Sequence, residues 1–388
     1  MELDSDLLAI RAGAREIAVG LRARALAVDA APDRLDEHLD GLQAVREMAR
    51  PGMRCLEAAV GLIELAWGDA GLVLACPGPG LAGVVVALLG DEAQRAQLDA
   101  AVSGGRSWAF VAITEPGSGS DVAAMRTRLV PDGSGGPDVT DASGVADAAG
   151  EAGGYLLNGE KVYIGNGARA SAGVVFARSG DGPLAIRAAL IQAPFPGLTA
   201  TALDMVGLRG AAISRLCFDA VPVPPGALLG SHLRQVHRGM WGAIQAFNTV
   251  RVHVAALAVG TALAVHDYVR DARGRPRQDE AAALDRIGAR IETVRRLTYR
   301  AAAAVDADSG HGSLASLAKL EAVALAQQAC TQLPRLLGPG ALLDHPLLEK
   351  WRRDCVAFEF MEGTSFIQRL NVTHGYLRAG LPGEEMAR

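Results

Sequence analysis

The hydrophobic pattern changes character twice along this chain, which limits the architectures that the chain can adopt. Residues 1–107 and 229–388 carry apolar side chains at helical spacing, whereas residues 108–228 carry short apolar runs bounded by Gly, Pro and Asp. Such a succession is typical of an α+β protein in which helices and strands are segregated. The sequence therefore predicts an N-terminal all-α domain, a middle β-barrel or sheet domain, and C-terminal helices, with these three ranges as the domains.

The composition argues against several classes of protein. The formal net charge of −5 comes without a long basic run, which argues against nucleic acid as a partner. The five cysteines are scattered and form no CxxC, so neither a disulfide framework nor a metal site is expected. No signal peptide follows Met1, and Pro77 and Pro79 interrupt the uncharged run 70–90. We therefore expect a cytoplasmic protein without a metal, nucleic-acid or membrane partner.

Residues 78–83 fit the G-x-G-x-x-G pattern of dinucleotide-binding loops and lie between two apolar runs. That interpretation requires an acidic residue at the end of a second strand about 20 residues later. No clear candidate stands there, so a turn between helices at 58–74 and 81–89 is the favoured interpretation. A further helix is expected at 93–102, after the capping residue Asp91.

A second Gly-rich loop follows the strand-like run 108–111 and has the sequence A-I-T-E-P-G-S-G-S-D-V-A-A. Pro116 fixes φ, while Gly117 and Gly119 permit backbone angles that other residues avoid. Hydroxyl groups are supplied by Thr114, Ser118 and Ser120. Such a loop can grip a cofactor or a phosphate through its N–H groups, although an ordinary Gly/Ser turn has the same composition.

This loop resembles the first signature of the acyl-CoA dehydrogenases, a family of FAD-dependent flavoproteins. The defining positions match in order, from a small residue and Ile through Thr114 and Glu115 to the run 118–121 and Ala124. By this resemblance the loop contacts both the flavin and the substrate. The implied cofactor-binding residues are Ile113, Thr114, Gly119 and Ser120, and Ser120 is also implied in substrate binding.

A second resemblance lies in the β region, where residues 157–167 are similar to the family's L-N-G-x-K-x-W-I-T-N. It implies that Tyr163 and Ile164 lie against the flavin ring. Gly165 occupies the cofactor-binding position at which the family has Thr, whose hydroxyl meets the reactive ring nitrogen. The Asn158-Gly159 pair is in addition a hairpin turn signal in its own right.

Near the C-terminus, residues 361–369 resemble the family's E-G-T-x-x-I-Q-R, and the family's R-D pair precedes them at the family spacing. The resemblance implies Glu362 as the catalytic base, Gly363 in substrate binding and Thr364 in cofactor binding. It also implies Arg251 at the substrate cleft. Some family members carry the catalytic Glu at the position just before this Arg, which is Val250 in this chain.

Two motifs depart from the family pattern. The family's Y-A-x-x-R-x-x-F-G-x-P, whose Arg reaches FAD across a subunit boundary, is shortened at 268–276, where Arg273 is the best substitute by position. The family's G-G-x-G-Y is replaced at 337–341. The adenine end of FAD, or the subunit interface, is therefore expected to be built differently.

The resemblance implies a reaction, FAD-dependent α,β-dehydrogenation of an acyl thioester, and a C-terminal four-helix bundle. A base must remove the Cα proton while a flavin takes the Cβ hydride, because side chains are poor hydride acceptors. Apolar neighbours must raise the pKa of the base, and Phe360, Met361 and Phe366 are the expected ones. The implied partners are an acyl thioester on CoA or a carrier protein, an electron acceptor such as an electron-transfer flavoprotein, and further copies in a homodimer or homotetramer. A flavin oxidase or monooxygenase on the same fold and a flavin-free scaffold remain alternatives.

Overall fold

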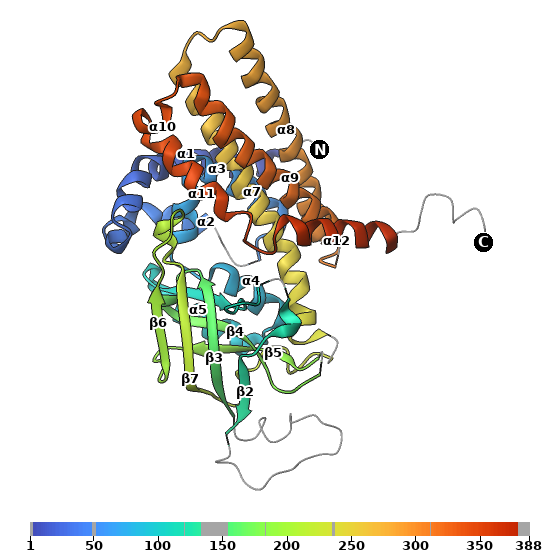
Figure 1. The fold of residues 1–388 in the computed structure, drawn as a ribbon. Helices are drawn as coiled ribbons and strands as arrows, with labels where there is room; N and C mark the ends of the chain where they lie inside the picture. Colours follow the sequence, from blue (N-terminus) through green and yellow to red (C-terminus); the bar gives the residue numbers. More distant parts are fainter. Residues whose placement is uncertain are drawn as a thin grey trace, which may run out of the picture. The chain divides into compact units, whose positions relative to one another are not determined.

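The predicted succession of helices, strands and helices is confirmed in the computed structural model (Figure 1). The structure describes residues 3–48, 52–119, 121–132, 154–182, 184–234, 237–310 and 312–378.

The chain divides into two compact units. A helical unit combines Met1–Leu74, Val206–Gly210 and Phe247–Arg388, and a sheet unit combines Ala75–Met205 and Ala211–Ala246. The N-terminal helices thus pack with the C-terminal helices around one core. The boundaries at 107/108 and 228/229 stay a prediction for the domains, although the helix-to-strand changes fall close to them.

The helical unit is built largely from long helices whose buried faces are rich in Ala, Val and Leu. Its helices are α1 (Ser5–Ala30), η1 (Pro32–Leu42), α2 (Gln43–Met48), α3 (Cys55–Ala75), α7 (Gly239–Arg273), α8 (Gln278–Ala307), α9 (Gly312–Gln332), η8 (Leu333–Leu337), α10 (Ala341–Asp344), α11 (Pro346–Ala357) and α12 (Ser365–Arg378). The first residues of α7, up to Ala246, belong to the sheet unit. Small side chains let these helices approach closely, so the core is closed without many aromatic residues.

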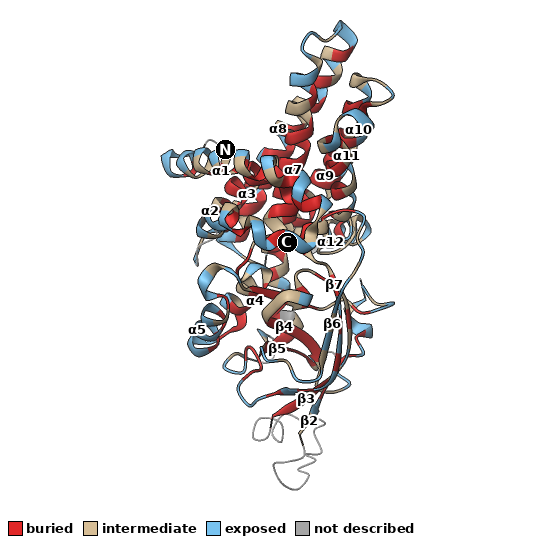
Figure 2. Ribbon diagram, turned by 90° about the vertical axis from the view of Figure 1, so that its left-hand side faces the viewer, coloured by how far each residue is buried: buried red, intermediate tan, exposed pale blue. Residues whose placement is uncertain are grey.

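Two helices in this unit are apolar and long enough to cross a bilayer, namely Cys55–Ala75 and Gly242–Arg273. Most of each apolar window is buried inside the protein, as the red colour of α3 and α7 in Figure 2 shows. Such burial is what core helices of a folded domain display, and length with composition is weak ground for assigning a membrane span.

The sheet unit contains a seven-stranded sheet in the order β1-β4-β2-β3-β7-β6, with β5 pairing β4. Its strands are β1 (Trp108–Ala112), β2 (Arg128–Pro131), β3 (Tyr155–Ile164), β4 (Ala170–Arg178), β5 (Ile186–Gln192), β6 (Leu198–Ala202) and β7 (Ser214–Val223). Two helices precede them, α4 (Gly80–Leu89) and α5 (Glu92–Ala101), and the short 3-10 turns are η2 (Ser103–Gly105), η3 (Val122–Ala124) and η5 (Gly167–Arg169). A further turn, η6 (Arg209–Ala211), begins in the segment that belongs to the helical unit.

Local signals fix the entry into this unit. The G-x-G-x-x-G run begins in the turn between α3 and α4, as favoured from the sequence, and its residues 80–83 form the first turn of α4. Gly78 pairs with Trp108 at the start of the sheet. Asp91 begins α5 with a capping box, because its carboxylate accepts from the Gln94 N–H (2.8 Å) and the Gln94 side chain accepts from the Asp91 N–H (3.0 Å).

The hairpin turn expected at Asn158-Gly159 is absent, because β3 continues through both residues. The strand is paired on both sides, with β2 and with β7, and the register shifts between Leu157 and Gly159. Gly159 takes φ +138°, and a Cβ at this position would lie 2.7 Å from the Cα of Thr127. The glycine therefore serves a β-bulge with a close backbone approach, and the two neighbouring strands override the local turn preference.

Candidate active site

Glu362 lies in the tight turn between α11 and α12, in the helical unit. Its φ is +53° and that of Gly363 is +94°, so two successive residues occupy the left-handed side of the φ/ψ map. A non-glycine residue in that region costs about 1–2 kcal/mol. The surrounding contacts must therefore hold Glu362 in this conformation.

Three donors from three helices bind the backbone carbonyls of this turn. The Glu362 carbonyl accepts from Arg251 Nε on α7 (3.4 Å) and from Gln368 Nε2 on α12 (3.0 Å). The Gly363 carbonyl accepts from Gln368 Nε2 (2.8 Å) and from Lys319 Nζ on α9. The turn is thus fixed by its main chain, which leaves the Glu362 side chain free to react.

The Glu362 carboxylate is half-buried and makes no hydrogen bond or ion pair with any residue that the structure describes. Burial raises its pKa above the usual value for Glu, and the positive charges of Arg251 and Lys319 partly oppose that rise. A carboxylate with a raised pKa and no permanent partner is suited to accept a proton.

The apolar neighbours expected around the base are only partly confirmed. Met361 packs against the helical core, but Phe360 and Phe366 are 70% and 65% exposed. Both rings flank the turn in sequence yet point away from the core of their own chain. Burial of Glu362 therefore comes from the helices that meet under the turn, and the two Phe positions expected from the sequence were the wrong source.

Arg251 belongs to the same cluster. Its Nη1 donates to Asn248 Oδ1 (2.6 Å), and Asn248 Nδ2 in turn donates to the Ser309 carbonyl (2.9 Å). Burial lowers the pKa of Arg251, and the negative charge of Glu362 opposes this effect. The predicted substrate-binding Arg is therefore brought beside the predicted base and is oriented by one turn of α7.

Thr364 and Glu359 begin the helix that follows the base. The Thr364 carbonyl accepts from the Gln368 N–H (2.9 Å), which opens the first turn of α12. The Glu359 carboxylate accepts from the Ser365 N–H (2.8 Å) and from the Ser365 hydroxyl (2.5 Å), so it caps the N-terminus of α12. Glu359 is therefore engaged in the fold, unlike Glu362.

In the sheet unit, the two segments predicted to contact a flavin lie side by side. The Ile113 carbonyl accepts from Lys161 Nζ (2.8 Å), and the Thr114 carbonyl accepts from the Val162 N–H (2.9 Å). Lys161 also pairs with Glu115 (2.9 Å), and both side chains are buried. This internal ion pair joins the end of β1 to the end of β3, at which the predicted flavin residues stand.

Tyr163, Ile164 and Gly165 separate into three environments. Tyr163 has φ +61° and is 63% exposed, so its ring stands out from the sheet. Ile164 is buried in the sheet core, where only its backbone is left for a ligand. At Gly165 the nearest atom to an added Cβ is Ile213 Cδ1, 3.9 Å away, so the position has room.

In the loop after β1, Ser118 makes its hydrogen bonds within the loop. Ser118 exchanges backbone hydrogen bonds with Glu115, and its hydroxyl donates to the Asp121 carbonyl (2.5 Å). The Ser118 hydroxyl, expected to face a ligand, is therefore used within the loop. Gly119 is exposed, and Ser120 lies outside the described residues.

Arg273, the predicted substitute for an FAD-contacting Arg, is not brought to the base. It ends α7, 22 residues after Arg251, which corresponds to about 33 Å along an α-helix. Its guanidinium pairs with Glu280 (2.7 Å), whose carboxylate also accepts from the Arg277 N–H (2.8 Å) at the start of α8. Within its own chain, Arg273 therefore stabilises the corner between α7 and α8.

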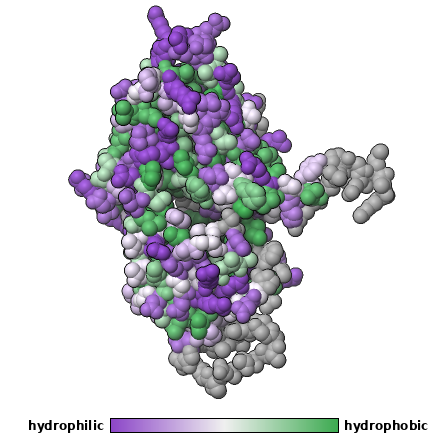
Figure 3. Space-filling view, in the orientation of Figure 1, coloured by the Kyte–Doolittle hydropathy of each residue, from purple (hydrophilic) through white to green (hydrophobic). Residues whose placement is uncertain are grey.

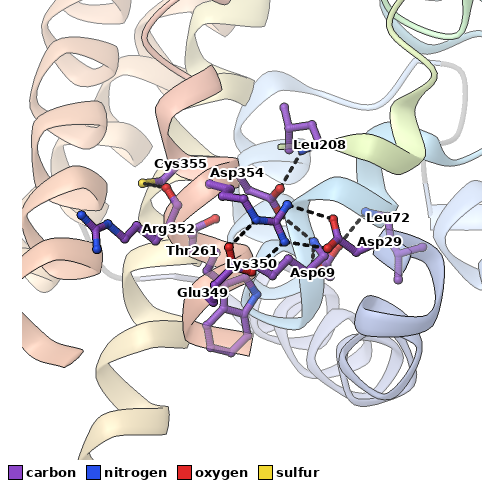
Figure 4. Close-up of polar contacts among 12 residues, drawn as sticks. Asp29, Asp69, Leu72, Leu208, Thr261, Glu349, Lys350, Arg352, Asp354 and Cys355 are labelled. Atoms are coloured by element: carbon purple, nitrogen blue, oxygen red, sulfur yellow. Dashed lines mark hydrogen bonds and ion pairs between the residues drawn. The ribbon is translucent and has the colours of Figure 1, made fainter. Parts of the chain in front are cut away.

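The R-D pair of the C-terminal motif has a structural task (Figure 4). Asp354 accepts from the Leu208 N–H (2.7 Å), and Arg353 donates to the Val206 carbonyl (2.6 Å). Asp354 also pairs with Lys350 (2.5 Å), and Lys350 binds Asp69 (2.7 Å), with all three side chains buried. This buried charge cluster fixes the segment Val206–Gly210 onto the helix that leads into Glu362.

Two residues that support the Glu362 turn or its neighbour Arg251 were not predicted from the sequence, namely Asn248 and Lys319. Asn248 gives no sequence signal, since one amide on a helix has many uses. Lys319 did give one, because it is one of three lysines in the chain and stands between Ala318 and Leu320 in an apolar run. In the structure its side chain is buried. A lysine is rarely buried without a task, so that position could have been flagged.

Comparisons with known proteins place the sheet region and the C-terminal helices in one family. A family model described as acyl-CoA dehydrogenase, middle domain, matches residues 110–221, and another described as acyl-CoA dehydrogenase, C-terminal domain, matches residues 237–377. The mitochondrial short-chain specific acyl-CoA dehydrogenase of Bos taurus is 30% identical to this chain, over 87% of this chain and 81% of the relative.

Two solved structures show the same fold. That of butyryl-CoA dehydrogenase from Megasphaera elsdenii gives a TM-score of 0.78 at 22% identity and covers 97% of this chain and 100% of that chain. That of the prolyl acyl carrier protein oxidase AnaB gives 0.79 at 23% identity and covers 98% and 100%. At these identities the likeness concerns the fold, and it confirms the predicted order of helical, sheet and helical parts.

Proposed function

Because this chain belongs to the acyl-CoA dehydrogenase family of FAD-dependent oxidoreductases, we propose that it removes hydrogen across the Cα–Cβ bond of an acyl thioester. The family match extends over both the sheet region and the C-terminal helices. Glu362 takes the Cα proton in this proposal. The thioester is carried by CoA or by a carrier protein.

One observation carries the proposal. The turn that holds Glu362 is fixed entirely through main-chain carbonyls, which bind Arg251, Gln368 and Lys319, while the carboxylate itself is left unpaired among the described residues. A structural carboxylate in such a cluster would accept these donors itself, as Glu359 does with Ser365. An unpaired carboxylate with two nearby cations is instead arranged for proton transfer.

The chemistry of the base follows from its surroundings. Burial raises the pKa of Glu362, which strengthens it as a base toward a weakly acidic carbon acid. Arg251 and Lys319 keep a share of the carboxylate ionised, because each favours the charged form. The protonated Glu362 that results is neutral and therefore compatible with its half-buried position.

Residues of the sheet unit fit a flat aromatic cofactor. Tyr163 presents an exposed ring in a strained backbone conformation, and Gly165 leaves space where a side chain would stand. Strain of this kind is retained where it serves a ligand. Thr114, Tyr163 and the Ile164 backbone would hold the flavin. Bound FAD supplies the acceptor for the Cβ hydride, which side chains cannot provide. Without a hydroxyl at Gly165, one hydrogen bond to the ring is missing.

Assembly and partners belong to the same proposal. Phe366, Leu370 and Leu377 recur along α12 and are 65%, 51% and 62% exposed, and Figure 3 shows hydrophobic residues on this part of the surface. Such a row supports a homodimer or homotetramer in which copies cover these side chains. An electron-transfer flavoprotein is the proposed electron acceptor, and the cytoplasm is the proposed location.

The proposal is tested with Glu362→Gln, which keeps the size of the side chain but cannot accept a proton. Flavin reduction by a thioester substrate, followed anaerobically by bleaching of the flavin absorbance, should slow by about 10²–10⁴-fold. FAD content should be unchanged, because the predicted flavin contacts lie largely elsewhere in the chain. Glu321→Gln on the exposed part of α9 serves as the matched control and should reduce at the wild-type rate.

Two results would contradict this assignment. Wild-type reduction rates in Glu362→Gln would show that another group removes the proton. Consumption of oxygen without an added electron acceptor, together with an oxygenated product in the mass spectrum, would favour the monooxygenase alternative. A panel of acyl-CoA and acyl-carrier thioesters identifies the acyl group in the same experiment.

A further inference from the structure

Lysine is rare in this chain, and each lysine is buried. Among 38 basic residues only three are lysines, Lys161, Lys319 and Lys350, and they are 0%, 1% and 3% exposed. Arginine takes every other basic position. A compact ammonium fits where a planar guanidinium does not, so we infer that each of these three positions requires a small buried cation.

Two of these lysines bind carboxylates directly. Lys161 lies 2.9 Å from Glu115, and Lys350 lies 2.7 Å from Asp69. Lys319 differs, because among the described residues its hydrogen bonds go to main-chain carbonyls, those of Gly363 and Glu359 (3.3 Å). A buried cation without a direct counterion is costly, so a nearby anion must compensate for its charge.

Two carboxylates compensate for the charge of Lys319, and one of them is the proposed base. The negative charges that face Lys319 are Glu359 and Glu362, and the positive charge that faces it is Arg251. Glu359 is engaged in capping α12 through Ser365. Both carboxylates therefore compensate for the Lys319 charge, Glu359 more strongly than Glu362, but only the Glu362 carboxylate has no hydrogen-bond partner among the described residues.

We propose that Lys319 is a positioning residue for the base: it holds the Glu362–Gly363 turn through main-chain carbonyls and supplies a buried positive charge that keeps the Glu362 carboxylate ionised. This inference rests on the proposed function of Glu362 and adds the residue that controls its geometry and its charge. Lys319 touches neither substrate nor cofactor in this role.

The charges of Lys319 and Glu362 each shift the pKa of the other, as this role requires. Burial lowers the pKa of Lys319 to about 8, whereas Glu359 and Glu362 raise it and Arg251 lowers it. The same Lys319–Glu362 interaction lowers the pKa of Glu362. Because such coupling is reciprocal, removing the Glu362 charge must lower the pKa of Lys319 by the amount that the Lys319 charge lowers that of Glu362.

The decisive experiment reads Lys319 directly. With lysine labelled at the ε-carbon, the holoenzyme gives three side-chain NMR signals, and Lys319→Gln identifies the one from Lys319. Wild type and Glu362→Gln are titrated between pH 6 and 10. We expect the Lys319 midpoint to fall by about one pH unit in Glu362→Gln, because a nearby negative charge that favours the ammonium is lost. Lys161 and Lys350 are internal controls and should not shift.

Two variants separate the charge of Lys319 from its hydrogen bonds. Lys319→Gln keeps a donor for the carbonyls but loses the charge, whereas Lys319→Met loses both. In the pH profile of kcat/KM, the acidic limb should move to higher pH by about one unit in both variants, because the pKa of Glu362 rises when the Lys319 charge is lost. Only Lys319→Met should also lower kcat, because the turn then keeps only two of its three donors, Arg251 and Gln368.

An unchanged Lys319 midpoint in Glu362→Gln would overturn the proposal, and so would an acidic limb that stays in place in Lys319→Gln. The NMR titration needs no turnover and is made with Lys319 intact. If Lys319→Gln fails to fold, the signals lost in Lys161→Arg and in Lys350→Arg assign the remaining one to Lys319, so the titration still decides the proposal. It also separates the two hypotheses: a shifted midpoint in a protein that dehydrogenates no thioester would refute the proposed reaction and retain the Lys319–Glu362 pair.

Discussion

Replacing Lys350 by Met tests whether the buried charge cluster stabilises the helical unit. Lys350 Nζ lies 2.7 Å from an Asp69 oxygen and 2.5 Å from an Asp354 oxygen, so these two oxygens are separated by at most the sum, 5.2 Å. Without the ammonium, two buried carboxylates face each other. Their repulsion is about 3 kcal/mol at an effective dielectric constant of about 20.

The variant can avoid this repulsion by protonating one carboxyl group, and the cost of doing so depends on pH. Keeping an Asp with an unfolded pKa of about 3.9 protonated costs about 4 kcal/mol at pH 7 and about 1.5 kcal/mol at pH 5. The folded variant then binds more protons than its unfolded chain, so its stability falls as the pH rises. We expect Lys350→Met to lose about 3–4 kcal/mol at pH 7 and about half of that at pH 5.

Urea unfolding followed by tryptophan fluorescence measures this loss, since Trp351 is buried next to Lys350 in the sequence. Arg34→Met is the matched control, because its ion pair with Glu37 is exposed on both sides, and it should change stability by less than about 1 kcal/mol. A loss below about 1 kcal/mol in Lys350→Met, or a loss that is the same at pH 5 and pH 7, would refute the reasoning.

Three further predictions concern other parts of the chain. Asp91→Ala removes the capping box of α5 and should cost about 1 kcal/mol in urea unfolding, whereas Asp91→Asn should retain most of it. Gly165→Thr meets no atom closer than 3.9 Å with its Cβ, so its melting temperature should stay near wild type while its FAD retention rises. Leu370→Glu places a charge on the apolar row of α12 and should lower the mass found by light scattering; an unchanged mass would place the interface elsewhere.

Much of the architecture could be predicted from the sequence, because helix and strand periodicity differ and the chain changes between them near residues 102–108 and 223–239. The candidate base was found by a motif and not by its surroundings. Glu362 before Gly363 has no distinctive pattern of its own, and only the folded turn shows that its carboxylate is left unpaired.

What the sequence could not supply depends on contacts between distant segments. Asn158-Gly159 reads as a hairpin turn locally, yet two flanking strands draw it into a bulge. Phe360 and Phe366 were expected beside the base but are exposed, since the local backbone, a turn at Phe360 and the first turn of α12 at Phe366, decides the direction of a side chain. The segment Val206–Gly210 lies within the β region in sequence but packs in the helical unit, because Asp354 binds its backbone.

The burial of all three lysines has a chemical consequence for a protein that handles thioesters. Acyl thioesters transfer their acyl group to exposed, unprotonated amines, and lysine side chains are the usual acceptors on a protein surface. On this chain each ε-amino group is withdrawn into a polar contact inside the fold, and guanidinium groups, which stay protonated, take the exposed positions. Lysine acylation by the class of compound on which the protein is proposed to act is therefore disfavoured on this chain.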